Sequence, residues 1–312
     1  MGDSISAGFA MLSGRPPLAS ILEYRGKVFS DGGDSGEYTL ANFLRTFQRR
    51  LNGSPSGVTL PLAHGKGLNT AVSGAIVQSL PEQVDQLRRQ FSWRGAYYRY
   101  RKSWKLVTLF IGSNNLCAAC NDATLNKQIY GDPAIADPEN YRDALLKTLR
   151  DLKSAVGGKA FVNLVGVFDV TLVYDQSRGF PYCEMLLDLM PIPICGCASS
   201  NDEARLKAGH LAREYNAVMQ QVADEINNGE EGRDGQFAVV YQPGLTEFKR
   251  GAAGYGQGFT SGLDCFHPNK CANQLMAISL WNNLFSPRSD KDAPSDPESA
   301  FIYCPGPTDY LQ

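Results

Sequence analysis

The stretch KLVTLFI at residues 105–111, followed by GSNN at 112–115, indicates the architecture of this 312-residue chain. A nearly continuous apolar run of this length is typical of a strand that is buried on both faces, as in a parallel sheet. A second such run, AFVNLVGVF, occupies residues 160–168, and FAVVY follows at 237–241. The chain therefore carries a set of buried strands, and the first of them ends at a cluster of polar residues.

Segments with apolar residues at helical spacing separate these strands. We expect helices over residues 39–51, 80–91, 138–156, 201–227 and 270–285, and a short strand over 57–63 that Pro61 disfavours. The alternation predicts one doubly wound α/β domain with helices on both faces of its sheet. The domain is expected to span residues 1–285, followed by a polar, Pro-rich linker at 286–299 and an apolar tail at 300–312.

The net charge of −2 gives no global attraction to nucleic acid or to an anionic surface. No apolar run approaches the length of about eighteen residues that a membrane-spanning helix needs.

Eight cysteines are present, and an even set with close pairs is typical of an oxidising compartment. Free thiols and a zinc site are the alternatives, but Cys117 and Cys120 form only half of a zinc motif. The pairing cannot be assigned from sequence. We expect most of the cysteines to pair and Cys304 to tie the tail to the domain. The sequon at Asn52 is consistent with secretion.

Reactive side chains are expected beyond the carboxyl ends of the strands, where open α/β sheets bind their ligands. Asp264 and His267 lie three residues apart before the last helix, so the carboxylate can orient the imidazole as a base. We interpret His210, inside a long helix, as structural or solvated. His64 follows an expected strand but has no acid near it in sequence.

Four blocks, namely GDSISAG at 2–8, NTAVSG at 69–74, GSNN at 112–115 and DCFH at 264–267, resemble in order and spacing those of the SGNH (GDSL-type) esterases and lipases. Longer segments, such as GGDSGEYTLANFL, LNTAVSGAIVQSLPEQ and FIYCPGP, resemble the eukaryotic phospholipase B branch of that family. The resemblance covers nearly the whole chain. It implies a three-layer, flavodoxin-like, mostly parallel sheet.

The resemblance implies a role for five residues. Ser4 is the nucleophile, His267 its base, and Asp264 the group that orients His267. The backbone N–H groups of Ser4 and Gly74 and the side-chain amide of Asn114 form the oxyanion hole, the set of donors for a negatively charged tetrahedral intermediate. Taken singly, Gly74 could merely begin a helix and Asn114 could merely cap one. The chain departs from the family at Asn115, where the family usually has Asp, and this departure could alter how Asn114 is held.

A second Gly-Asp-Ser contains Ser35, in a Gly-rich acidic loop before the helix expected at 39–51. Because Ser4 precedes every other block, as in the family, we interpret Ser35 as a coincidence. The G-x-S-x-G motif of the α/β-hydrolases does not occur.

Residues 88–105, RRQFSWRGAYYRYRKSWK, combine basic and aromatic side chains without an acid. We favour a solvated connection whose aromatic rings pack on the sheet. A transient contact with a membrane surface and, less favoured, nucleic-acid binding are the alternatives.

Taken together, these observations predict a secreted or extracellular membrane-associated, monomeric serine esterase that needs no metal or cofactor and binds no nucleic acid. Phospholipids and lysophospholipids are the expected substrates. A short-chain or carbohydrate acetyl-esterase, or an inactive lipid-binding module, remain alternatives.

In the family, a strand precedes the Gly-Asp-Ser block, and only Met1 stands there in this chain. We therefore expect the natural chain to continue upstream through an apolar strand to a signal peptide. We also expect the 312 residues alone to be poorly stable and nearly inactive.

Overall fold

A computed structural model describes residues 1–61, 63, 65, 67–189, 195–198, 201–244, 246, 258–291 and 300–312, with the side chains of 176, 188 and 189 left out. Its strands are β1 (Lys105–Phe110), β2 (Ala160–Val165) and β3 (Phe237–Gln242). Its α-helices are α1 (Ser4–Ala7), α2 (Leu40–Phe47), α3 (Leu80–Phe91), α4 (Ser113–Ala118), α5 (Ala123–Tyr130), α6 (Pro138–Ala155), α7 (Leu172–Ser177), α8 (Pro181–Leu189), α9 (Asp202–Asn228) and α10 (Lys270–Asn283). Short 3-10 helices are η1 (Arg25–Lys27), η2 (Val77–Ser79), η3 (Tyr98–Tyr100) and η5 (Arg288–Asp290).

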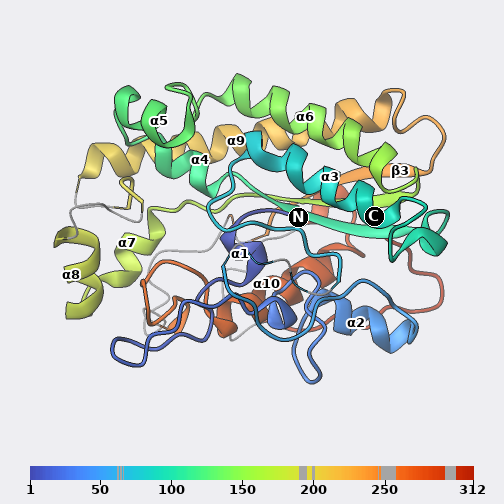
Figure 1. Cartoon of the computed structure of the whole chain (residues 1–312), viewed down its shortest axis with the longest axis horizontal. Helices are drawn as coiled ribbons and strands as arrows, with labels where there is room; N and C mark the ends of the chain where they lie inside the picture. The colour runs from blue at the N-terminus through green and yellow to red at the C-terminus, as the bar shows by residue number, and fades with distance from the viewer. Residues whose placement is uncertain are drawn as a thin grey trace.

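The three strands form one parallel sheet in the order β1-β2-β3. Val162 and Leu164, in the central strand, are fully buried, as the apolar run predicts. The sheet lies between α3, α6 and α9 on one side and α1, α2 and α10 on the other (Figure 1). The expected alternation of strands and helices is therefore present.

Side-chain caps set where the long helices begin. Asp137 accepts from the N–H groups of Glu139 and Asn140 at the start of α6, and Asn201 accepts from Ala204 at the start of α9. The five helices expected from periodicity agree with α2, α3, α6, α9 and α10 to within a few residues at each end.

The strand expected over residues 57–63 is wrong. Thr59 forms only an isolated antiparallel bridge with Glu23. Pro61 has no N–H to donate to a sheet, which explains why the pairing does not extend.

Met1 and Gly2 lie beside the outer edge of β1. Gly2 forms a parallel bridge with Phe110, whose N–H donates to the Met1 carbonyl at 3.3 Å, and the Met1 amino group donates to the carbonyl of Thr108 at 2.9 Å. These two residues therefore occupy the last positions of the strand that the sequence leads us to expect before Ser4. Burial lowers the pKa of the Met1 amino group.

A groove of about 380 Å³ continues along β1 from this point, lined by Leu106, Thr108, Leu87 and Phe91 among others. That an added upstream strand would raise stability and activity stays a prediction.

The carboxyl-terminal tail is held by hydrogen bonds and not by a disulfide, so the prediction for Cys304 is wrong. Cys304 is free and exposed, as is Cys271. Instead, the indole N–H of Trp281 donates to the Tyr303 carbonyl at 2.7 Å. The side-chain amide of Asn282 donates to the carbonyl of Phe301 and accepts from the N–H of Tyr303. Of the expected linker, only residues 286–291 lie within the described part. No helix in the described ranges has both the length and the apolar character to cross a bilayer.

Candidate active site

Ser4 is the first residue of α1, at the carboxyl end of the strand position that Met1 and Gly2 occupy. Asp3 caps this short helix by accepting a hydrogen bond from the N–H of Ile5 at 2.9 Å. Gly2 must lack a side chain, because a Cβ there would meet the carbonyl oxygen of Phe110 at 2.1 Å. Gly2 therefore lets the backbone pass close to β1 and deliver Ser4 to the sheet edge.

His267 and Asp264 lie in the loop that precedes α10. Nδ1 of His267 lies 2.6 Å from Oδ2 of Asp264, and Nε2 lies 2.8 Å from Oγ of Ser4. The other oxygen of Asp264 accepts from the N–H groups of Phe266 and His267. Both carboxylate oxygens are thus fixed, and the imidazole is held between the acid and the hydroxyl.

The ionisation of Asp264 suits this position. Burial raises its pKa, but the neighbouring charge and hydrogen bond of His267, together with two backbone N–H donors, outweigh that effect and lower it overall. An ionised Asp264 accepts a hydrogen bond from the N–H of Nδ1 and so leaves Nε2 unprotonated as an acceptor. Nε2 can therefore take the proton from the hydroxyl of Ser4.

The backbone N–H groups of Ser4 and Gly74 belong to the expected oxyanion hole. Within the described residues, neither the N–H of Ser4 nor that of Gly74 donates a hydrogen bond. Gly74 has a φ of 82°, which favours glycine, and nothing lies within 4 Å of where its Cβ would stand. Nδ2 of Asn114 donates to the carbonyl of Ala75 at 2.8 Å, which places the amide beside Gly74. The amide of Asn114 thus lies beside Gly74, and the joint role of the three donors in an oxyanion hole stays a prediction.

Asn115, where the chain departs from the family pattern, is fully buried, and both polar atoms of its side chain form hydrogen bonds. Its Oδ1 accepts from the N–H of Val77, and its Nδ2 donates to Gln78 and to the carbonyl of Ile135. A carboxylate could not make the bond to Ile135, because it has no N–H. The amide therefore fits this site, and Asn114 remains in place beside Ala75.

The family model described as GDSL-like Lipase/Acylhydrolase matches residues 1–280. The chain belongs to this family. Human "Phospholipase B1, membrane-associated" is 30% identical over 301 residues, which cover 93% of this chain and 19% of that protein. The rat protein of the same name is 29% identical over 319 residues, covering 99% of this chain and 21% of that protein. The chain therefore spans about a fifth of the length of these relatives.

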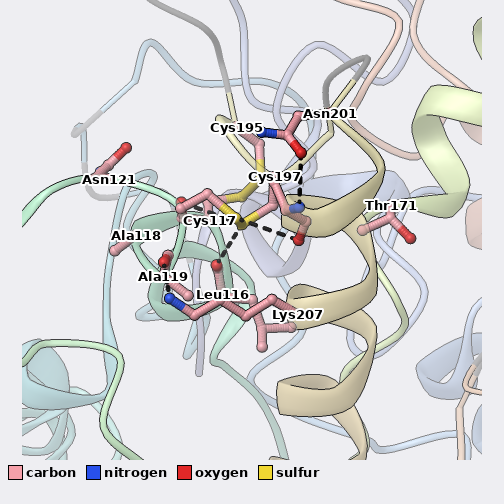
Figure 2. The surroundings of a disulfide bond; sticks show 12 residues. Leu116, Cys117, Ala118, Ala119, Asn121, Thr171, Cys195, Cys197, Asn201 and Lys207 are labelled. Carbon is pink, nitrogen blue, oxygen red and sulfur yellow. Dashed lines mark hydrogen bonds between the residues drawn. A yellow bond between two sulfur atoms is a disulfide. The ribbon is translucent and has the colours of Figure 1, made fainter.

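Disulfides hold the helix and the loop that carry the last two family blocks. Cys195 and Cys197, from the segment before α9, reach Cys117 and Cys120 at the end of α4 (Figure 2). Because α4 begins with Ser113 and Asn114, these bonds fix the helix that carries the amide donor. The side chain of Lys207 donates to the carbonyl of Ala119 in the same region.

A third disulfide, Cys183–Cys265, joins α8 to the loop between Asp264 and His267. The hydroxyl of Tyr182 adds a hydrogen bond to Leu263 in the same loop. The prediction that most of the cysteines pair is confirmed. The sequence does not predict that Cys265, two residues before His267, pairs with Cys183, because no spacing rule relates positions 82 residues apart.

Of the other candidates from the sequence, Ser35 and His210 do not join the site. Ser35 is exposed in the loop before α2. His210 is exposed on α9, where its Nδ1 contacts Arg213, in agreement with its interpretation as a solvated residue. His64 lies outside the described residues. Among the residues described, no group of three or more His, Cys, Asp or Glu side chains is placed to hold a metal ion.

The basic and aromatic segment 88–105 lies at the other end of the sheet. It leads into the amino end of β1, whereas Asn114 follows the carboxyl end of that strand. Trp93 and Trp104 are exposed, and the guanidinium of Arg94 packs on the Trp93 ring. This surface is therefore separated from Ser4 by the length of β1.

Gln83 was missed by sequence reasoning. From α3, its side chain accepts from the N–H of Gly2 at 2.9 Å and donates to the carbonyl of Gly2 at 2.7 Å. Gln83 thus binds the backbone just before the nucleophile, as a neighbouring strand would. A polar residue on the apolar stripe of an amphipathic helix is the signal that could have indicated it.

Proposed function

We propose that this chain hydrolyses carboxylic esters through an acyl-enzyme on Ser4. The observation that carries the proposal is the continuous set of contacts from Asp264 through His267 to Ser4, with distances of 2.6 and 2.8 Å. A serine hydroxyl is a weak nucleophile until a positioned base removes its proton, and this arrangement supplies that base.

In the first half-reaction, Oγ of Ser4 attacks the carbonyl carbon of the ester while Nε2 of His267 takes the hydroxyl proton. The carbonyl oxygen becomes an oxyanion, which the N–H groups of Ser4, Gly74 and Asn114 would stabilise. The tetrahedral intermediate collapses, the C–O bond to the leaving alcohol breaks, and His267 gives its proton to that alcohol.

In the second half-reaction, His267 takes a proton from water, and the hydroxide attacks the acyl carbon. Collapse of the second tetrahedral intermediate breaks the bond to Oγ, releases the carboxylic acid and returns the proton to Ser4. Asp264 stabilises the imidazolium in both halves. In both half-reactions, His267 takes up the proton and gives it back.

We further propose that the ester is a phospholipid or lysophospholipid. The support is the printed name of the relatives, phospholipase B1, at about 30% identity over most of this chain. We place the protein outside the cytosol, because three disulfides persist only where the environment is oxidising.

A substrate panel tests the proposal. The purified chain is assayed with phosphatidylcholine, lysophosphatidylcholine, p-nitrophenyl butyrate and an acetylated sugar, with Ser4→Ala as the blank. Release of fatty acid from the two phospholipids at a higher kcat/KM than from the other esters is the expected result. Preference for the acetylated sugar would contradict the lipid assignment, and no turnover of any ester would contradict the enzyme assignment.

A further inference from the structure

Glu23 and Arg25 form an ion pair in the interior, beside the family block at residues 69–74. Nη2 of Arg25 lies 2.6 Å from Oε2 of Glu23, and the side chains are 3% and 0% exposed. The mechanism proposed above uses neither residue. Their position raises the question of why two charges are kept out of water at this point.

The pair binds every second residue of the segment that leads to Gly74. Arg25 donates to Oδ1 of Asn69 at 2.8 Å and to the carbonyl of Ala71 at 2.9 Å. Oε1 of Glu23 accepts from the hydroxyl of Ser73 at 2.6 Å. The side chains of Glu23 and Arg25 thus provide hydrogen-bond partners along residues 69–73.

The same network reaches the helix of the nucleophile. Nδ2 of Asn69, whose Oδ1 is held by Arg25, donates to the carbonyl of Ser6 in α1 at 2.8 Å. The N–H of Val72 donates to the carbonyl of Gly2 at 3.1 Å. Segment 69–73 is therefore fixed relative to the backbone on both sides of Ser4.

Gly74 itself donates no hydrogen bond within the described residues, so its neighbours set its orientation. Ser73 is held on one side by Glu23, and the carbonyl of Ala75 is held on the other by Asn114. Rotation of the peptide between Ser73 and Gly74 would change the direction of the Gly74 N–H. The hydroxyl of Ser73 is the nearest side-chain anchor against that rotation.

Stability alone gives a poor reason for the ion pair. Removing two charges from water costs several kcal/mol per ion, and apolar residues of similar volume are often as stabilising or more so. What apolar residues cannot do is fix polar backbone groups at defined positions. An oxyanion hole requires that property, because a donor misplaced by about 1 Å can lose about a hundredfold in rate.

We propose that Glu23, Arg25 and Ser73 are positioning residues that aim the N–H of Gly74 at the oxyanion. Glu23 acts through the hydroxyl of Ser73, and Arg25 acts through the backbone of 69–71. The inference rests on the proposed ester hydrolysis. It adds Glu23 and Arg25, which lie outside the family blocks, and Ser73, which lies within the block at 69–74 but has no role in the proposed chemistry.

Ser73→Ala tests the proposal, because it removes one hydroxyl from a partly exposed turn and leaves the ion pair intact. We expect kcat to fall by roughly ten- to a hundredfold, while KM and the melting temperature stay close to those of the wild type. Ser73→Thr keeps the hydroxyl and is expected to restore most of the rate. Ser79→Ala is the matched control, since Ser79 bonds only within its own turn, at Ile76.

Arg25→Lys keeps the charge but loses the planar fork that reaches both Asn69 and Ala71. We expect kcat to fall again, and circular dichroism establishes whether the variant folds. Wild-type kcat in Ser73→Ala, or an equal loss in Ser73→Ala and Ser79→Ala, would overturn the inference while leaving the proposed function intact. A wild-type chain that turns over no ester would overturn the proposed function itself.

Discussion

Nε2 of His267 lies 2.8 Å from Oγ of Ser4, although 263 residues separate them in the chain. The parallel sheet explains the meeting, because the carboxyl ends of its strands gather at one edge. Ser4 arrives there through the bridge between Gly2 and Phe110, and His267 arrives in the loop before α10.

Asn114→Ala should lower kcat by roughly 10² to 10³, because it removes one of the three oxyanion donors. Steady-state kinetics on the best substrate of the panel measure the change. Asn140→Ala is the control, since Asn140 makes a similar bond from its side chain to a carbonyl, at the exposed start of α6. Equal rates in the wild type and in Asn114→Ala would mean that the amide only holds Ala75.

Asn115→Asp should lower the free energy of unfolding by about 3 kcal/mol. The buried amide donates to Gln78 and Ile135, and a carboxylate would lose those bonds while placing a charge in the interior. Urea denaturation followed by circular dichroism measures the difference. An unchanged midpoint and slope would show that the residue tolerates the acid found in the family pattern.

Loss of the proton of Asp3 should lower the free energy of unfolding as the pH rises from about 4 to about 7. Burial raises its pKa from 3.8 to about 7, so the native state holds a proton that the unfolded chain has already lost. The decline from this one group amounts to about 4 kcal/mol at most. Melting temperatures between pH 4 and 8 measure it.

Asp3→Asn keeps the helix cap and removes the titration, so its melting temperature should fall less over the same pH range than that of the wild type. Asp137→Asn, at the exposed cap of α6, serves as the control and should keep the wild-type slope. If Asp3→Asn and the wild type have parallel profiles, Asp3 does not titrate in this range.

Alkylation without reduction should label two cysteines, Cys271 and Cys304, in protein from a secretory host. The other six are paired and should react only after reduction. Intact-mass measurement before and after reduction counts the labels. Labelling of all eight in the unreduced sample would refute the disulfides, and labelling of none would mean that the two free thiols pair.

The elements that sequence predicts best are those in which local pattern and global packing agree. The buried run at 105–111 and the amphipathic segment at 80–91 each form the expected element, β1 and α3. The expected strand at 57–63 fails because a single Pro outweighs a short apolar run. The small helices α1 and α4 depend on tertiary contacts, such as the bridge at Gly2 and the disulfides of α4, which no local window contains.

The contacts of the candidate triad match the roles that family resemblance implies for Ser4, Asp264 and His267. The supporting residues are different. Glu23 and Arg25 lie in no recognisable motif, and their partners are 44 to 50 residues away in the chain. Sequence reasoning misses such contacts because burial of a charged residue depends on the whole fold, whereas the pattern Asp-x-x-His lies within one turn.

We propose that Ser4, and not Ser35, carries the acyl group. Ser4→Ala and Ser35→Ala are compared with the wild type for ester turnover, after circular dichroism has established that all three are folded. We predict that Ser4→Ala lowers kcat by a factor on the order of 10⁴ to 10⁶, since loss of one triad member removes nearly the whole effect, while Ser35→Ala leaves it unchanged. Loss of activity in Ser35→Ala with retention in Ser4→Ala would show that Ser35 is the nucleophile.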